Sequence, residues 1–173
     1  DVDVTKVAAA EGIPTSVLYA IIQNETGGLS DRAGAKSPTG VRGLAQVTMA
    51  TGKRFMGESF DPSDPQQSAE AGAKYLKWLF DRYQNWELAA MAYNGGEGTI
   101  DAAIEACGTR SPDCVAENVR FNGESGSAKN AEIRGYLTKF RRNMDGGSFG
   151  VLHDAVAKAR NTLAGLTVKS SAE

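Results

Sequence analysis

The stretch VLYAIIQNETGG, residues 17–28, carries both a clear fold signal and an unusual side chain. Its apolar residues recur at the spacing of one helical face, and they are Val17, Leu18, Ile21 and Ile22. Glu25 follows on that same face, four residues after Ile21, just before the pair Gly27-Gly28. Charged side chains are rare on a buried stripe, so Glu25 needs an explanation.

Two interpretations of Glu25 remain open from the pattern. In the structural one, Glu25 caps the helix or pairs locally with Arg32 or Arg42 and does nothing else. In the functional one, the apolar surroundings disfavour the charged form, raise the pKa and make the carboxyl group a proton donor. A glycosidase acid needs such surroundings. Glycoside hydrolysis usually adds a second carboxylate, but spacing to Glu25 marks none of the candidates near polar loops: Asp31, Glu58, Asp61, Glu97 and Glu132.

Length and composition bound the class of protein. The chain has 173 residues, of which 41% are hydrophobic and 23% charged, as in one soluble globular domain. The net charge of -2, with no long basic run, argues against binding to nucleic acid. No segment is long and apolar enough to span a membrane, and no signal peptide is visible. Because the first residue is Asp, we expect a mature product, a trimmed piece or a domain of a longer protein.

The cysteines leave two possibilities. Cys107 and Cys114 flank a short polar loop, and they either close a small disulfide, as in an oxidising compartment, or remain free thiols. A metal site is not expected, because His153 is the only histidine and no CxxC motif occurs. We expect no cofactor.

Helical patterns dominate the chain and predict an all-α domain. The expected helices span residues 4–11, 15–25, 48–56, 64–83, 86–93, 99–106, 133–144 and 152–166. The loop over 26–46 has room for a small β-hairpin, and the polar segment 107–130 is expected to be irregular. We expect residues 1–145 to form the domain and 146–173 to form a helix that packs on it or leads to a linker.

The clearest start signal is Asp64-Pro65-Gln66-Gln67. Asp64 suits the N-cap, and Pro65 suits the first helical position. Gln67 has the spacing to complete a capping box. The sequence therefore predicts a helix that begins at Pro65.

Residues 25–49, ETGGLSDRAGAKSPTGVRGLAQVTM, resemble the catalytic core of the lytic transglycosylases of the goose-lysozyme-like superfamily. The matching positions are Glu25-Thr26-Gly27, Ser37 and Gly43-Leu44-Ala45-Gln46. Further matches follow in the family's order at residues 61–76, at AYNGGEG (residues 92–98) and at EIRGYL (residues 132–137). Each motif is weak alone, but their order over roughly residues 13–140 makes the resemblance strong.

The resemblance implies a lysozyme-like helical domain that binds peptidoglycan in a cleft. The family cleaves the β-1,4 bond between N-acetylmuramic acid and N-acetylglucosamine, and Glu25 would protonate the bridging oxygen as general acid. Glu25 would then act as base toward the 6-hydroxyl of the muramic residue, which leaves a 1,6-anhydro end. Because the substrate supplies the nucleophile, no second catalytic carboxylate is required.

The resemblance also implies roles for the other matched positions. Ser37 would orient Glu25, while Gln46 and Asn94 would hydrogen-bond the sugar or its acetamido group. Glu132 would support the site from the late helix. Two aromatic residues would line the cleft or, in the structural alternative, face the core: Tyr93 and Tyr136.

Three departures from the family's pattern concern the expected cleft lining. Ala45 stands where Met is usual, Val47-Thr48 replaces a hydrophobic-Met-Pro run, and Glu97 stands where Pro is common. These departures put the subsite preference in question and leave the implied reaction class unchanged.

Two rival functions stay open. One is a goose-type lysozyme hydrolase on the same fold, in which Asp31 or Glu97 would position water. The other is a non-catalytic glycan-binding subunit of a virion or secretion system. The setting implied by the resemblance is extracytoplasmic, either in the periplasm or in a phage virion that acts there, with the chain part of a larger virion or envelope assembly.

Overall fold

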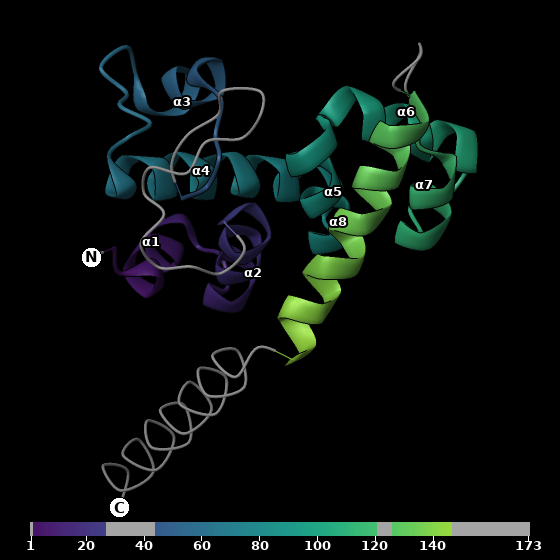
Figure 1. Cartoon of the computed structure of the whole chain (residues 1–173), viewed down its shortest axis with the longest axis horizontal. Coiled ribbons are helices and arrows are strands. Elements are labelled where there is room, and N and C mark those ends of the chain that lie inside the picture. Colours follow the sequence, from purple (N-terminus) through teal and green to yellow (C-terminus); the bar gives the residue numbers. More distant parts are fainter. Residues whose placement is uncertain (1, 27–43, 121–125, 147–173) are drawn as a thin grey trace, which may run out of the picture.

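The computed structural model describes residues 2–26, 44–120 and 126–146, and these ranges contain eight α-helices and no strand (Figure 1). The helices are α1 (Val4–Glu11), α2 (Thr15–Thr26), α3 (Met49–Met56), α4 (Pro65–Tyr83), α5 (Trp86–Gly95), α6 (Glu97–Cys107), α7 (Pro112–Asn118) and α8 (Gly126–Gly146). The all-α prediction is confirmed. Residues 27–43 of the loop expected to hold a small hairpin, 26–46, and the expected last helix, 152–166, lie outside the described residues.

Helix α5 occupies the centre of the domain. It packs against α4 on one side and α8 on the other, and α8 in turn crosses α2 (Figure 1). The side chains of Leu88 and Met91 on α5 are completely buried, as are Leu18 and Ile21 on α2. The apolar stripe of residues 17–22 is therefore a core face, as its spacing predicts. Among the described helices, none combines the length and the apolar character needed to cross a membrane.

Helix α4 begins as predicted, with one difference in its cap. The Oδ1 atom of Asp64 accepts the backbone N–H groups of Gln66 at 2.9 Å and Gln67 at 3.3 Å. The capping-box prediction for Gln67 is wrong, because its Oε1 atom accepts the N–H of Asp61 at 2.9 Å. The N–H of Asp64 already donates to the carbonyl of Asp61 at 3.2 Å, so the preceding turn satisfies the donor that a capping box would bind.

Helix α7 and the first residues of α8 lie inside the segment expected to be irregular, 107–130, so that prediction is wrong for residues 112–118 and 126–130. Helix α7 begins with Pro112 at its first turn and buries Val115 completely. A disulfide joins Cys107 at the end of α6 to Cys114 on α7, with a Cα–Cα distance of 5.9 Å. A helix of seven residues offers too few turns for its periodicity to show in the sequence.

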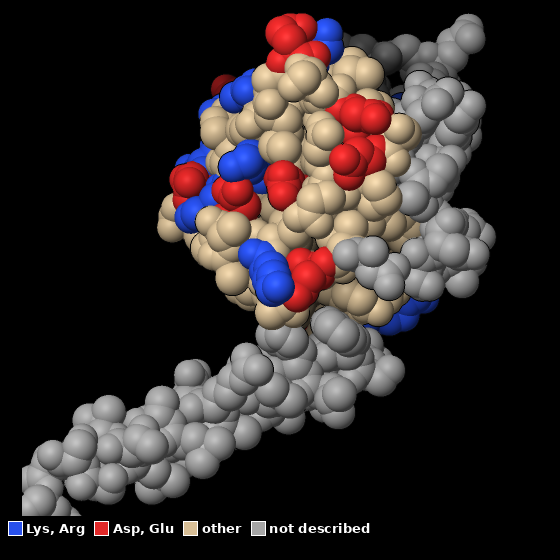
Figure 2. Space-filling model, turned by 90° about the vertical axis from the view of Figure 1, so that its left-hand side faces the viewer, with Lys and Arg blue, Asp and Glu red and all other residues tan. Residues whose placement is uncertain are grey.

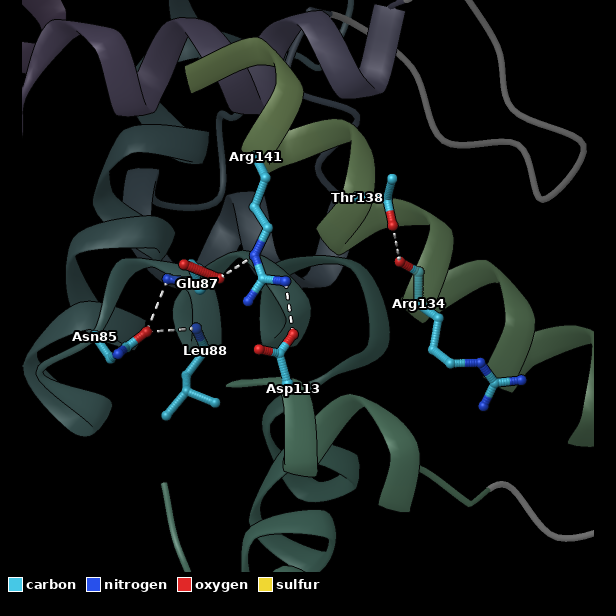
Figure 3. Close-up of polar contacts among 7 residues, drawn as sticks. All are labelled: Asn85, Glu87, Leu88, Asp113, Arg134, Thr138 and Arg141. Atoms are coloured by element: carbon cyan, nitrogen blue, oxygen red, sulfur yellow. Dashed lines mark hydrogen bonds and ion pairs between the residues drawn. The ribbon is translucent and has the colours of Figure 1, made fainter. Parts of the chain in front are cut away.

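Arg141 ties α8 to two other helices (Figure 3). Its Nε atom donates to Glu87 on α5 at 2.6 Å, and its Nη1 atom donates to Asp113 on α7 at 2.6 Å. The N-cap of α5 lies beside this cluster, where Asn85 Oδ1 accepts the N–H groups of Glu87 and Leu88. The late helix is thereby fixed against the centre of the domain.

Charged side chains of both signs are spread over the face shown in Figure 2. Acidic and basic groups adjoin on one part of it, and further acidic groups stand apart on tan surface. That face lacks the single-sign basic patch that a phosphate backbone requires.

Candidate active site

Glu25 lies in the last turn of α2, where its carboxyl group is partly buried. The hydroxyl of Tyr136 on α8 donates to Glu25 Oε1 at 2.7 Å. Burial raises the pKa of Glu25 from 4.5 to about 7; the Tyr136 hydrogen bond opposes this rise and the charge of Glu132 adds to it. The negative end of the helix dipole acts in the same direction as burial. With a pKa near 7, the carboxyl group of Glu25 is partly protonated at neutral pH.

Asn24 holds Tyr136 in place beside Glu25. Its Nδ2 group donates to the backbone carbonyl of Tyr136 at 3.1 Å, and its Oδ1 atom accepts from Asn143 Nδ2 at 2.7 Å. These bonds join α2 to α8 at the acid. The sequence analysis missed Asn24, because its partner lies 112 residues away and no local pattern connects them.

Tyr93, at the end of α5, supports the segment that leads to Gln46. Its hydroxyl donates to the carbonyl of Ala45 at 2.7 Å and lies over Gly72 of α4, where an added Cβ would come within 2.8 Å of it. Burial raises the pKa of Tyr93, and the charge of Glu25 adds to the rise. Tyr93 thus lies close enough to Glu25 to feel its charge.

A pocket of about 280 Å³ has Tyr93 in its lining. Its lining comes from the segment before α3, from α3 itself, and from the facing parts of α4 and α5: Gln46, Val47, Thr48, Thr51, Tyr75, Tyr93, Asn94, Gly95 and Gly96. Gln46 has a left-handed backbone, with φ at +48°, which is uncommon for a residue with a side chain. Strain of this kind concentrates at functional sites.

Asn94 lines this pocket and has one unsatisfied polar atom. Its Nδ2 group donates to Glu132 Oε1 at 3.3 Å, while its buried Oδ1 atom has no hydrogen-bond partner among the described residues. Buried polar atoms are nearly always bonded, so such an atom points to a donor that a ligand would bring.

The structure brings most of the predicted site residues together. Tyr136 bonds Glu25 directly, Glu132 acts on Glu25 by its charge and bonds Asn94, and three predicted residues line the pocket: Gln46, Tyr93 and Asn94. Ser37 lies outside the described residues. Glu25 and Tyr136 are not among the residues that line the pocket. In the described part of the chain, no group of three His, Cys, Asp or Glu side chains could hold a metal ion.

Tyr75 lines the pocket although the sequence analysis did not select it. Its hydroxyl donates to Glu97 Oε2 at 3.1 Å, so Glu97, one of the departures from the family pattern, lies beside the pocket. Ala45, another departure, is completely buried, and its side chain does not line the pocket. The expectation of an altered lining is therefore wrong for Ala45.

The remaining described carboxylates among the early candidates serve local structure. Glu58 pairs with Lys53 at 2.9 Å. Asp61 accepts the backbone N–H of Ser63 at 2.9 Å in an exposed turn. Neither contact involves the residues around Glu25.

The helices and the buried acid define a lysozyme-like all-α domain. Two solved structures share this fold: an inactive mutant of lytic transglycosylase Slt from Pseudomonas aeruginosa (TM-score 0.64, 20% identity) and the 70 kDa soluble lytic transglycosylase from Escherichia coli (TM-score 0.63, 21% identity). Each alignment covers 82% of this chain, and 23% and 24% of those chains. At these identities the likeness establishes the fold alone.

Residues 4–113 match the transglycosylase SLT domain, and the chain belongs to that family. The membrane-bound lytic murein transglycosylase F of Pasteurella multocida is 42% identical over 74 residues, which are 38% of this chain and 14% of that protein. The protein of the same name from Cellvibrio japonicus is 38% identical over 109 residues, or 58% of this chain and 21% of that protein. The chain thus spans about a fifth or less of the length of these relatives.

Proposed function

We propose that this chain is a lytic transglycosylase domain that cleaves the glycan strands of peptidoglycan between N-acetylmuramic acid and N-acetylglucosamine. The carboxyl group of Glu25 carries the proposal, because burial at the end of an apolar helix raises its pKa to about 7. A general acid works best when its pKa lies near the working pH. The family match and the names of the relatives support the same reaction class.

In the first step, Glu25 donates its proton to the bridging oxygen while the bond from that oxygen to the anomeric carbon breaks. The carboxylate that forms accepts the hydrogen bond of Tyr136, which favours the charged state. Glu25 then takes the proton of the muramic 6-hydroxyl, whose oxygen attacks the anomeric carbon. The products are a 1,6-anhydro end and a new free hydroxyl on the other fragment, and Glu25 ends protonated as it began.

The pocket beside Tyr93 suits the acetamido group of the substrate. In the part of the chain that the structure describes, the buried Oδ1 atom of Asn94 lacks a partner, and an acetamido N–H is a donor that would satisfy it. Glu132 fixes the orientation of Asn94 through the bond to its Nδ2 group. Gln46, on its strained backbone, also lines the pocket and would bond the sugar. In this proposal Ser37 orients Glu25.

Action on peptidoglycan places the domain outside the cytoplasm. The relatives are named membrane-bound murein transglycosylases, which fits a periplasmic setting. A virion that acts in the periplasm would present the same substrate to the same site.

Digestion of purified peptidoglycan, followed by mass spectrometry of the fragments, tests the proposal. We expect anhydro products from the unmutated chain and none from Glu25→Gln, because the Gln side chain has nearly the same shape but cannot act as an acid or a base. Glu58→Gln is the matched control, because that carboxylate is exposed and pairs with Lys53. Lysis by a folded Glu25→Gln variant would remove the central claim.

The main alternative is a hydrolase on the same fold. In that reaction Asp31 or Glu97 would position the attacking water, and Glu97 accepts a hydrogen bond from Tyr75, which lines the pocket. Products heavier by one water, lost in Glu97→Gln, would replace the transglycosylase proposal with hydrolysis.

A further inference from the structure

Arg54 differs from the other cationic side chains of α3 and α4. Four of those helices' cations pair with a carboxylate: Lys53 with Glu58, Lys74 with Glu11, Lys77 with Asp81 and Arg82 with Asp101. In the described part of the chain, no carboxylate oxygen lies within 4.0 Å of a nitrogen of Arg54. One exposed cation on this side of the domain is therefore unpaired.

The unpaired guanidinium of Arg54 is nevertheless held in place. Its central carbon lies 4.4 Å from the ring centroid of Trp78 and 5.0 Å from that of Phe55. Attraction between the cation and the aromatic faces fixes the plane of the group. A guanidinium stacked in this way keeps N–H donors at its edge for a carboxylate.

A row of aromatic rings connects Arg54 to the pocket. The ring of Phe55 lies 5.9 Å from that of Tyr75, and Tyr75 lies 5.3 Å from Tyr93. Tyr75 and Tyr93 both line the pocket. The charge of Arg54 reaches the Tyr75 hydroxyl, where it opposes the rise in pKa that burial and Glu97 cause. Arg54, Phe55, Tyr75 and Tyr93 therefore follow one another from the exposed side of α3 to the lining of the pocket.

We propose that Arg54 binds a carboxylate of the peptide carried by the glycan strand, so that peptide-bearing strands bind better than stripped ones. This inference rests on the proposed function. Two sources of a carboxylate exist on muramic acid: the lactyl group of a stripped strand and the free carboxylates of the attached peptide. Tyr75 and Phe55 follow Tyr93 at successive ring spacings of 5.3 and 5.9 Å, so Arg54 is separated from the pocket by more than one aromatic ring, and the peptide is the longer of the two groups that could reach it.

Affinity measurements in the full chain carrying Glu25→Gln test this proposal without cleavage. The probes are peptidoglycan strands with their peptides attached and the same strands after an amidase has removed the peptides. We expect Arg54→Gln to weaken binding of peptide-bearing strands about tenfold, the loss of one charge-assisted contact, and to change binding of stripped strands less than about twofold. Lys53→Gln, the adjacent paired cation on α3, is the matched control and should change neither.

Three results would overturn the proposal. Equal weakening of both probes would assign Arg54 to the lactyl carboxylate or the sugar. The same loss of affinity in Lys53→Gln would show that any positive charge on α3 has this effect. Unchanged binding in Arg54→Gln would show that Arg54 does not contact the peptide. Arg54→Lys keeps the positive charge but lacks the planar guanidinium. An intermediate loss of affinity for peptide-bearing strands, at unchanged thermal stability, would support a two-point contact between the guanidinium and a carboxylate. If the unmutated chain cleaves no strand, the proposed function fails, whereas the affinity ratio still decides the role of Arg54.

Discussion

Replacing Gly72 with Ala should strain the support of the pocket. An added Cβ at this position would lie 2.5 Å from Ala45 Cβ and 2.8 Å from the Tyr93 hydroxyl, both closer than real Cβ atoms approach. Ala45 is completely buried, and its carbonyl accepts the Tyr93 hydroxyl at 2.7 Å. Neither neighbour is the end of a flexible chain, so the segment that carries Gln46 must shift.

The magnitude follows from two opposing effects. Overpacking of this kind costs about 1–3 kcal/mol, while Ala in a helix interior is favoured over Gly by about 1 kcal/mol. Gly135 lies inside α8 with nothing within 4 Å of an added Cβ, so Gly135→Ala should gain the second effect alone. The difference between the two variants therefore isolates the overpacking, and we expect Gly72→Ala to be less stable than Gly135→Ala by about 1–3 kcal/mol.

Urea unfolding of both variants under identical conditions measures this difference, and thermal midpoints should separate by about 2–12 °C. Peptidoglycan digestion should also slow in Gly72→Ala, because Gln46 and Tyr93 move together. Equal free energies of unfolding for the two variants would show that Ala45 and Tyr93 yield without strain, and the argument from close contact would be wrong.

Three further predictions concern the acid and the disulfide. The carboxyl group of Glu25 releases its proton near pH 4.5 in the unfolded chain and near pH 7 in the folded one, so the free energy of unfolding should fall as the pH rises between these values. Glu25→Gln should remove up to about 3 kcal/mol of that fall, measured by urea unfolding at each pH. In the unmutated chain the hydrogen bond from Tyr136 lowers the pKa of Glu25, so its removal in Tyr136→Phe should raise that pKa. The alkaline limb of the kcat/KM profile should therefore move up by about one to two pH units, and an unmoved limb would contradict this role of Tyr136. Replacing Cys107 and Cys114 with Ser should lower the free energy of unfolding by about 2–3 kcal/mol, and reduction of the unmutated chain should match it.

Local pattern predicted most of the described helices and the place of Glu25. The stripe over residues 17–22 fixes the buried face of α2, and the glutamate follows from the same periodicity. The start of α4 could also be predicted, because Asp64 and Pro65 act on their immediate neighbours. In each case the interactions that determine the element lie within a few residues of each other.

Long-range contacts could not be predicted from pattern. Asn24 bonds Tyr136 across 112 residues, and nothing in the flanking sequence of either residue marks the pair. The unpaired state of Arg54 depends equally on where distant carboxylates fall. The resemblance to a known family selected Tyr136 and Glu132, but it did not show that one hydroxyl bonds the acid and one carboxylate acts on it by charge.

The crossing of α2 by α8 has a consequence for the order in which the site is made. The family match ends at residue 113, whereas α8 begins at Gly126, so the hydroxyl that bonds Glu25 is supplied by a later part of the chain. During synthesis on the ribosome, Glu25 emerges 111 residues before its partner. An intermediate that ends after α7 would lack both the Tyr136 hydroxyl and the Glu132 carboxylate that act on Glu25. The surroundings of the glutamate are thus complete only when the last described helix docks.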